Sequence, residues 1–513
     1  MVMDSGRANR WLLAGLVLVW ATPMPTGAQE ATNLVRMYEL TELTADGATQ
    51  SRAYALNNTG QIIGWIDVME TRHSAYWHNQ STTDLHDTVH FVLRHPIFDQ
   101  DHSEAFDISN SGQVVGTART VIDCLGEQIL ITNSYILRPA VLTDLATPYP
   151  GDALTNLFTL GNPCLAHDSA ATGISNSNHV VGWADREDGV IHGFLVRPVD
   201  GQFFRDEEDP LTVNDLMIDL GTLAASDPVS SATGVNDTGE VTGYSYTTGN
   251  DGAGGYHAFL ITPIDTDGDD TPDAWFTGAS GVNNLMADLG TLGGTNSWGR
   301  AINNLGEIVG ESDLDTAAGE HYTHAFYWKD GAMMDLGTLV TGGEQGFSAA
   351  SAINDDGVVV GWTENDDRER RAFVYEDGEM QDLNDLLYLL DEDGNTIIPS
   401  ITLTEARDIN DDGTIVGWGT LRGSDSNVTR GFLLNPVMID PSVFEEEEEE
   451  PAEAEPATAG QTSTGDPTLG PPEHLDTDSP TLPPSGFCTP TSFAFPALTV
   501  AGLWLFKLGS RQR

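Results

Sequence analysis

Basic residues are scarce in this chain of 513 residues. It contains 22 Lys and Arg against 78 Asp and Glu, which gives a formal net charge of −56. A surface of this sign repels the phosphate backbone of nucleic acids and disfavours contact with anionic lipid. We therefore expect no nucleic-acid partner. The charge suits a soluble extracellular protein, a high-salt habitat or a cation-binding surface.

Cysteine is also rare, with Cys124, Cys164 and Cys488 as its only occurrences. None of these residues has the Cys-x-x-Cys spacing or another metal-ligand spacing, which argues against a zinc site. Cys124 and Cys164 lie in neighbouring repeats and could form a disulfide in an oxidising compartment. The alternative is two unpaired small residues in loops.

Known catalytic signatures are missing from the sequence. It has no Gly-x-Ser-x-Gly elbow, no phosphate-binding loop and no dinucleotide fingerprint. The 78 acidic residues offer so many carboxylate pairs that none of them indicates glycoside chemistry. The sequence therefore favours a non-enzymatic protein.

The two longest apolar segments are short and lie near the ends of the chain. Near the N-terminus, Arg7 and Arg10 precede the apolar run Trp11–Trp20, and small residues follow at Thr26–Ala28. This order of basic, apolar and small residues is typical of a secretory signal peptide. Residues 1–28 are therefore expected to be removed on export. The folded part of the mature chain would then occupy residues 29–440.

The C-terminal part begins with a segment that we expect to be disordered. Residues 441–487 contain the acidic run Glu445–Glu450 and are rich in Pro, Glu, Thr and Ser. Such a composition buries too little apolar surface to fold and repels itself. This segment is therefore predicted to be an extended spacer.

Residues 488–513 combine Cys488, the apolar segment Phe493–Phe506 and a basic tip. The apolar segment is shorter than the about 20 residues of a membrane-spanning helix. The layout resembles the C-terminal sorting tails of bacterial surface proteins, in which the segment pauses in the membrane before the protein is cut and then anchored or released. Cys488 stands near the place where one type of tail carries a sorting or anchoring cysteine. The alternative is a weak transmembrane helix that stays in the membrane.

One pattern, apolar–Asn–x–x–Gly–x–x–x–Gly, recurs seven times in the middle of the chain. The copies are Leu56–Gly64, Ile108–Gly116, Ile174–Gly182, Val235–Gly243, Ile302–Gly310, Ile353–Gly361 and Ile409–Gly417. Strand-forming repeats separated by 51 to 67 residues predict a propeller rather than a helical solenoid or a β-helix.

The first half of the pattern has the chemistry of a β-turn. An Asn followed three residues later by Gly suits a type I turn whose last residue is left-handed. The third copy has Asn178 instead of this Gly, and Asn is the next-best residue at positive φ. Ser109 and Ser175 replace the leading Asn in two copies, and Ser can also cap such a turn. The pattern therefore predicts a β-hairpin.

The second glycine of each copy lies inside the second strand of that hairpin. Glycine in a strand marks a β-bulge or the close approach of another backbone. We therefore expect structural roles for Gly64, Gly116, Gly182, Gly243, Gly310, Gly361 and Gly417.

Each repeat offers two further strands. One is centred on an aromatic residue and often begins with histidine, and the other reads Asp-Leu-Gly-Thr-Leu, as in Asp219–Leu223, Asp288–Leu292 and Asp335–Leu339. Four strands per repeat correspond to one propeller blade. The predicted fold is all-β, a seven-bladed β-propeller of four-stranded blades.

The last repeat lacks an Asp-Leu-Gly-Thr-Leu strand, whereas Tyr38–Leu43 looks like a spare copy before the first hairpin. We expect this N-terminal strand to join the last blade and close the ring, because closure removes an exposed sheet edge. Val437–Ile439 could compete for the same place.

The repeats resemble the HAF repeat family, a group of extracellular repeats named after the triplet His-Ala-Phe. The resemblance lies in the succession of Ala301–Gly310, His324–Phe326 and Asp335–Leu339, and it extends over roughly residues 38 to 440. It implies an extracellular setting and no defined activity.

The recurring histidines are candidates for metal binding or catalysis. A residue that occurs once per blade is spread around a ring, so we expect a structural hydrogen-bonding role instead. These residues are His73, His192, His257 and His324.

An acidic loop offers a sharper candidate for a metal site. Asp265, Asp267, Asp269 and Asp273 occupy positions 1, 3, 5 and 9 of a calcium-loop spacing. The loop departs from an EF-hand, because Phe276 stands where a bidentate Glu is expected. The sequence therefore predicts either a calcium site or a solvated acidic turn, and it predicts no other cofactor.

Together these features predict an exported protein at a bacterial cell surface or outside the cell. We expect a binding or structural scaffold for a surface glycan or protein, with membrane contact only through the C-terminal tail. The alternative is a propeller-type polysaccharide hydrolase or lyase, whose catalytic residues would lie in irregular blade loops.

Overall fold

The computed structural model describes residues 34–79, 81–85, 102–124, 127–137, 154–158, 168–203, 214, 216–224, 229–248, 254–269, 271–278, 281–315, 321–342, 345–388, 397–423 and 428–440. They belong to a compact unit that extends to Glu446. The predicted signal peptide (1–28), spacer (441–487) and sorting segment (488–513) lie outside the described residues. Among the residues described, no helix is long and apolar enough to cross a membrane.

The strands described form seven antiparallel sheets of four strands each, without helices. In chain order, six of these blades are β2 (Ala48–Leu56), β3 (Ile62–Val68), β4 (Thr71–His78) and β5 (Ser81–Asp84); β6 (Ser103–Ile108), β7 (Val114–Cys124), β8 (Glu127–Leu137) and β9 (Leu154–Phe158); β10 (Ser169–Ile174), β11 (Val180–Asp185), β12 (Ile191–Val196) and β13 (Met217–Asp219); β14 (Ser230–Val235), β15 (Val241–Thr248), β16 (Gly254–Ile261) and β17 (Met286–Asp288); β18 (Gly293–Ile302), β19 (Ile308–Leu314), β20 (Thr323–Lys329) and β21 (Ala332–Gly337); and β22 (Ser348–Ile353), β23 (Val359–Glu364), β24 (Arg370–Glu376) and β25 (Glu379–Asp382).

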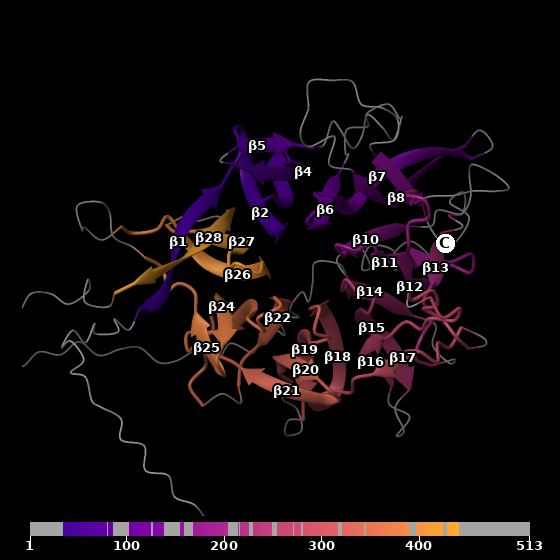
Figure 1. Ribbon diagram of the computed structural model, residues 1–513. Helices are drawn as coiled ribbons and strands as arrows, with labels where there is room; N and C mark the ends of the chain where they lie inside the picture. Colours follow the sequence, from indigo (N-terminus) through magenta and orange to yellow (C-terminus); the bar gives the residue numbers. More distant parts are fainter. Residues whose placement is uncertain are drawn as a thin grey trace, which may run out of the picture. The chain divides into compact units, whose positions relative to one another are not determined.

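The seventh blade joins the two ends of the described chain. It consists of β26 (Ile401–Ile409), β27 (Ile415–Leu421), β28 (Thr429–Ile439) and β1 (Val35–Leu43), with β1 paired to β28 from Val35↔Ile439 to Leu43↔Gly431. The blades stand in a ring, and the first strand of each blade is innermost (Figure 1). The predicted seven-bladed propeller and its closure by the N-terminal strand are therefore confirmed. Val437–Ile439 does not compete with β1, because it continues β28 and pairs with β1.

All seven predicted hairpins join the first and second strands of a blade. The apolar residue of each motif ends the inner strand, as Leu56 ends β2 and Ile409 ends β26. The fourth turn residue has positive φ in every copy, including Asn178 at 67°. Its N–H donates to the carbonyl oxygen at the start of the turn, as Gly306 does to Asn303 at 3.1 Å. The turn chemistry read from the sequence therefore holds in all copies.

The Asp-Leu-Gly-Thr-Leu segments were expected to be the outer strands, and this expectation is wrong in detail for two of the three copies. The outer strands β13 and β17 precede the motif and end at its Asp residue, Asp219 and Asp288, whereas β21 includes Asp335, Leu336 and Gly337 of the third copy. The leucine that follows is buried, and its N–H bonds back to the third strand, as Leu289 does to Ala258 at 2.9 Å. The motif thus ends one blade and begins the connection to the next.

The hydrophobic core lies between consecutive blades rather than at one centre. One cluster, for example, joins Trp65 and Tyr76 of the first blade to Ile108 and Tyr135 of the second. Another packs Tyr38 of β1 against residues of the sixth and seventh blades. Burial between blades holds the ring together, and it leaves the inner strands to line the axis.

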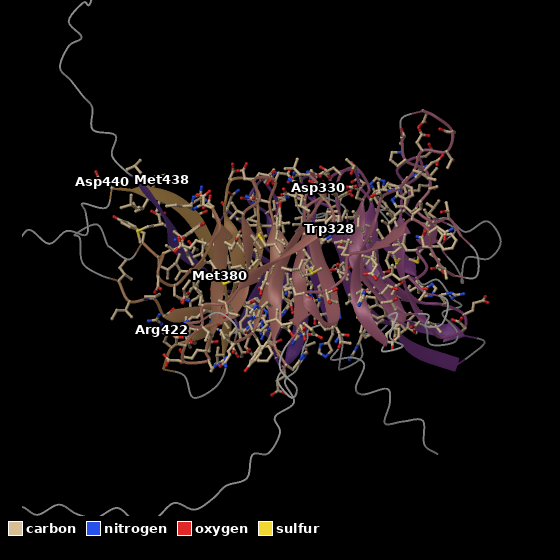
Figure 2. The ribbon with its side chains drawn as sticks, turned by 90° about the horizontal axis from the view of Figure 1, so that it is seen from below. Trp328, Asp330, Met380, Arg422, Met438 and Asp440 are labelled. Atoms are coloured by element: carbon tan, nitrogen blue, oxygen red, sulfur yellow. The ribbon has the colours of Figure 1, made fainter. Side chains whose placement is uncertain are left out.

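Seen from the side, β28 runs past the neighbouring strands to Met438, and Asp440 follows it (Figure 2). Met438 and Val35 at this end keep 56% and 43% of their surface exposed. The paired ends of β1 and β28 thus project from the ring.

Candidate functional site

The second glycine of every repeat stands where a side chain would collide with the inner strand. A Cβ atom at any of the seven positions would lie 2.0 to 2.1 Å from a carbonyl oxygen of that strand. The inner strand carries a β-bulge next to this point in all seven blades, for example between Ala350 and Ala352. The expectation of a bulge and a close backbone approach is therefore met at Gly64, Gly116, Gly182, Gly243, Gly310, Gly361 and Gly417.

The aromatic residue of the third strand also needs this glycine. Phe373 is opposite Gly361 in the β23–β24 ladder, and a Cβ at Gly361 would lie 2.8 Å from the Phe373 ring. The same pairing joins Gly310 to Phe326, and both phenylalanines are fully buried. The glycine thus leaves room for the aromatic ring that seals the gap between blades.

The recurring histidines each bind an aspartate at or near the end of the outer strand of their own blade. The Nδ1 atoms of His73, His192, His257 and His324 lie 2.6 to 2.9 Å from Asp84, Asp219, Asp288 and Asp335. Burial alone would raise the pKa of Asp219, but hydrogen bonds from His192 and Gly221 leave it below its usual range. Each of the four His–Asp pairs lies in a different blade, and the pairs form no common centre. The expected hydrogen-bonding role of these histidines is therefore confirmed.

The blades are also joined by hydrogen bonds that the sequence interpretation missed. Five residues before the apolar motif position, a buried serine occupies the inner strand in six blades. Ser348 is typical, because its hydroxyl accepts from Ala325 N–H at 2.8 Å and donates to Gly337 O at 2.6 Å, both in the preceding blade. The regular spacing of this serine from each turn was the sequence signal.

A closed circle of hydrogen bonds links the seven hairpin turns. The second turn residue of each repeat donates its backbone N–H to the side-chain oxygen of the corresponding residue in the next repeat, at 2.7 to 3.5 Å. The order is Asn58, Asn110, Asn176, Asp237, Asn304, Asp355, Asp411 and back to Asn58. One end of the ring is therefore tied together by Asn and Asp side chains.

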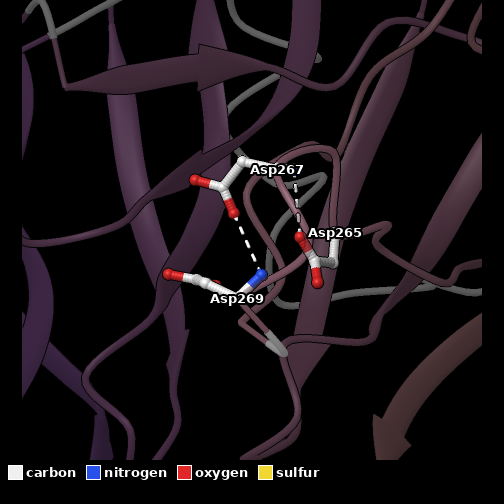
Figure 3. Close-up of side chains that lie close together, drawn as sticks. All are labelled: Asp265, Asp267 and Asp269. Carbon is white, nitrogen blue, oxygen red and sulfur yellow. Dashed lines mark hydrogen bonds between the residues drawn. The ribbon is translucent and has the colours of Figure 1, made fainter.

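The acidic loop brings three of its four predicted ligands together. Carboxylate oxygens of Asp265, Asp267 and Asp269 lie within 4.8 Å of one another, and all three side chains are exposed (Figure 3). Backbone N–H groups of the loop donate to them, as Asp267 N–H does to Asp265 at 3.1 Å. Asp273 turns instead toward Thr266, whose hydroxyl donates to it at 2.8 Å. The loop thus brings together three of the four carboxylates that the sequence suggested as ligands.

The predicted disulfide falls outside what the structure describes. Cys124 ends β7, but its side chain is not among those described, and Cys164 and Cys488 lie outside the described residues altogether.

A different cluster lies on the first three strands of the sixth, seventh and first blades. Arginine and tryptophan side chains alternate there across blade boundaries. The guanidinium of Arg370 lies 3.8 Å from the ring centre of Trp362, and that of Arg52 lies 4.0 Å from Trp418. Arg52 also lies 5.4 Å from the centre of Trp65. Arg72 is 4.2 Å from the same ring and extends the row. We call this set, with Arg300, Arg407 and the glutamates that bind them, the arginine–tryptophan cluster.

Three glutamates hold the arginines of this cluster. Glu405 accepts from Arg370 at 2.6 Å and from Arg407 at 2.9 Å, and its side chain is 8% exposed. Burial would raise the pKa of Glu405, but the two arginines outweigh it and keep the carboxylate ionised. Glu104 accepts from Arg72 at 2.6 Å.

Glu311 pairs with Arg300, which extends the cluster along the inner wall. Burial lowers the pKa of Arg300 and the Glu311 and Glu405 carboxylates raise it, with a net rise. The paired charges of β18, β19 and β26 therefore act on one another.

The arginines of the cluster remain accessible although they lie deep in the ring. The side chains of Arg300 and Arg370 are each 38% exposed, and that of Arg407 is 33% exposed. Burial, aided by Arg407, nevertheless lowers the pKa of Arg370. Arg300 and Arg407 belong to the inner strands β18 and β26, Arg370 belongs to the third strand β24, and all three side chains are partly exposed.

The inner-strand members of the cluster arise because the repeats differ two and four residues before the apolar motif position. Four blades place charged or aromatic residues there, namely Arg52 and Tyr54, Glu104 and Phe106, Trp298 and Arg300, and Glu405 and Arg407. The other three have only Ala, Ser or Thr at these positions, as in Ala349 and Ser351. Aligning the repeats on their turns would have revealed this asymmetry, which the search for shared residues passed over.

Two buried carboxyl groups lie next to the cluster. Burial raises the pKa of Asp107 to about 6, and burial together with Asp107 raises that of Asp408 to about 8. Each also clips two blades together, since Asp408 accepts from Leu56 N–H and Asp107 from Ile174 N–H, both at 2.8 Å.

A groove of about 960 Å³ lies elsewhere, on the outer part of the sixth blade. Met380 and Arg422, labelled in Figure 2, contribute to its wall together with Asp366 and Asp382. Several of its polar groups bind one another, as Arg422 donates to Thr402 at 3.1 Å and Asn384 to Asp382 at 2.7 Å. Because those groups are already satisfied by protein, we regard the arginine–tryptophan cluster as the stronger candidate site.

Comparison with known proteins gives a partial family match. Residues 230–459, less than half of the chain, match a family described as a protein of unknown function, DUF3466. No curated protein matches the chain.

Among solved structures, the chain is similar to the β-propeller domain of the Trilobed protease from Pyrococcus furiosus, with 9% identity, TM-score 0.28, and 66% of this chain and 98% of that chain covered. It is also similar to a PL25 ulvan lyase, with 8% identity, TM-score 0.32 and coverage of 78% and 96%. A third is the Aleuria aurantia lectin, with 11% identity, TM-score 0.24 and coverage of 66% and 96%. At these identities the likenesses concern the propeller fold alone.

Proposed function

We propose that this protein is a non-enzymatic binding scaffold, exported to the cell surface or beyond, whose ligand contacts the arginine–tryptophan cluster. The observation that carries the proposal is the concentration of charge. Five of the 22 basic residues of the chain gather in this cluster, in a protein with a net charge of −56. Arginines packed against aromatic rings are typical of recognition surfaces.

The export part of the proposal rests on sequence. The signal-like residues 1–28, the spacer and the sorting-like tail support display outside the cell, as does the resemblance to the extracellular HAF repeats. We propose membership of that repeat family on the same motifs.

A propeller-type hydrolase or lyase is the second candidate, and Asp107 and Asp408 are the observation that favours it. Carboxyl groups with a pKa moved toward neutrality are frequent in active sites. Against this, both oxygens of Asp408 accept backbone N–H groups, from Leu56 and Ile409 at 2.8 and 2.9 Å. A carboxyl held in this way is better placed to join blades than to move a proton.

The binding proposal is tested by screening the full exported chain against immobilised glycans and cell-envelope extracts. We expect ligands whose capture is lost when Arg370 and Arg407 are both replaced by Gln and retained when Arg36 and Arg422 are. No captured ligand in either screen would overturn the proposal. Turnover of a polysaccharide that disappears in Asp408→Asn would establish the enzymatic alternative instead.

We also propose that the acidic loop binds calcium, supported by the three adjacent carboxylates of Asp265, Asp267 and Asp269. Calcium takes six to eight oxygen ligands, which three carboxylates and water molecules can supply. Calcium at 100 times its dissociation constant should stabilise the fold by about 2.7 kcal/mol, because it binds only the folded loop.

The measurement is the melting temperature with calcium and with a chelator. The calcium-dependent rise should vanish in Asp267→Asn and persist in Asp377→Asn, which alters an exposed turn residue elsewhere. If the melting temperature of the native chain is the same with calcium and with a chelator, the loop does not bind calcium.

A further inference from the structure

The arginine–tryptophan cluster has more hydrogen-bond donors than the protein uses. An arginine side chain carries five N–H donors in one plane. The Nε atoms of Arg72, Arg370 and Arg407 are buried and have no hydrogen-bond partner among the described residues, so a ligand would have to meet the terminal nitrogens of these side chains. Arg52 forms no ion pair there, and its one long side-chain hydrogen bond is 3.5 Å to the Thr429 hydroxyl.

The charge of the cluster is also incompletely balanced. Its five arginines face Glu104, Glu311 and Glu405, and Asp67 lies 3.9 Å from Arg72. Glu405 serves two arginines at once, so Arg52 is left with its positive charge between two indole rings. The cluster therefore keeps a local excess of positive charge inside a strongly acidic protein. The acidic residues around it do not neutralise this excess, so an anionic ligand can.

Aromatic rings stand beside these donors. Tyr54 and Phe106 are stacked with their ring centres 6.0 Å apart, and Phe106 is only partly buried. The Tyr54 ring lies 5.2 Å from the Arg407 guanidinium. Tyr54 is itself buried, so the partly buried Phe106 supplies the accessible apolar surface beside these charged groups.

We propose that this cluster binds a carboxylate-bearing saccharide, such as a hexuronate unit. A carboxylate matches the planar fork of a guanidinium with two parallel hydrogen bonds. A uronate ring adds a flat C–H face for the aromatic surface, which a flexible acidic peptide side chain lacks. The inference rests on the proposed binding function and specifies its ligand.

The test uses the full exported chain and a pair of matched probes, tetragalacturonic acid and its methyl ester, in calorimetric titrations. The acid should bind, and the ester should bind at least about 10-fold more weakly, because it keeps the ring and loses the charge. Binding of the acid should weaken as salt is raised. Equal binding of acid and ester overturns the carboxylate inference and leaves the binding function standing.

A variant pair assigns the binding to the cluster. Arg52→Gln should weaken binding of the acid on the order of 10-fold or more, because it removes a charged donor that has no ion partner in the protein. Arg36→Gln, which alters an arginine paired with Glu376 on the outer part of the ring, should bind normally. If both variants bind the acid as the native chain does, the cluster is not the site. If the acid, the ester and every glycan of the screen fail to bind, the proposed function falls as well.

Discussion

A chain that begins at Leu34 is expected to unfold at the same temperature as the full chain, whereas a chain that begins at Thr44 should unfold far lower. The shorter chain lacks β1, which pairs with β28 along its whole length. It also exposes the edge of β28, which favours aggregation. Thermal unfolding followed by circular dichroism, with light scattering, measures both effects.

A single side chain accounts for much of this expected loss. Tyr38 is 1% exposed and packs in the core between the sixth and seventh blades. Its backbone donates to Leu386 at 2.9 Å and accepts from Tyr388 at 2.8 Å. Tyr38→Ala keeps these backbone bonds but loses the buried ring, which should cost about 3–5 kcal/mol. Glu39→Ala, at an exposed position of the same strand, is the control. An equal melting temperature for the Leu34 and Thr44 chains would show that β1 does not close the ring.

Replacing the second glycine of one repeat should be nearly as damaging. In Gly361→Ala the new methyl group would lie 2.1 Å from the Ala349 carbonyl oxygen and 2.8 Å from the Phe373 ring. Neither neighbour can move without shifting a strand or opening the contact between blades. We expect a loss of about 3 kcal/mol or more, measured by denaturant unfolding, at the upper end of the usual cost of overpacking.

The first glycine of the same repeat supplies the matched control. Gly357 has a φ of 80°, and a Cβ there would have its closest contact at 3.7 Å. Gly357→Asn should change stability by less than about 1 kcal/mol, because Asn tolerates positive φ and the third repeat already carries Asn178 at this place. Similar losses for Gly357→Asn and Gly361→Ala would mean that crowding at the inner strand is not the reason for the second glycine.

The sequence predicted the scaffold because the scaffold depends on local chemistry that repeats. The turn from Asn303 to Gly306 needs only four residues to specify its geometry, and seven copies make the pattern unmistakable. Closure could be predicted as well, since the last repeat lacked a strand that Tyr38–Leu43 resembled.

The outer strands were predicted less accurately, because the recurring pattern of the Asp-Leu-Gly-Thr-Leu motif lies at the end of the strand. Asp288, Leu289 and Gly290 form a capped turn, in which Asp288 accepts from Gly290 N–H at 2.8 Å. The strand itself, Met286–Asp288, carries no recurring signature.

The sequence analysis missed the candidate site because it compared residues that recur in every repeat. The residues of the cluster differ from one repeat to the next. Arg52, Arg370 and Arg407 come from two inner strands and one third strand, far apart in sequence. Only the closed ring brings β2 beside β27, and with it Arg52 over Trp418. Residues that recur in all repeats therefore identify the blades, and residues that differ between repeats identify the candidate site.

The pairing of β1 with β28 also sets the order in which the protein can mature. Tyr38 faces Pro436, so a chain emerging from the ribosome or a translocation pore carries its first strand without a partner until almost all seven blades have followed. Contacts this distant in sequence form slowly. The ring therefore finishes as a late, all-or-none event, and the site between its first and last blades exists only after that event. A truncated product has blades but no site.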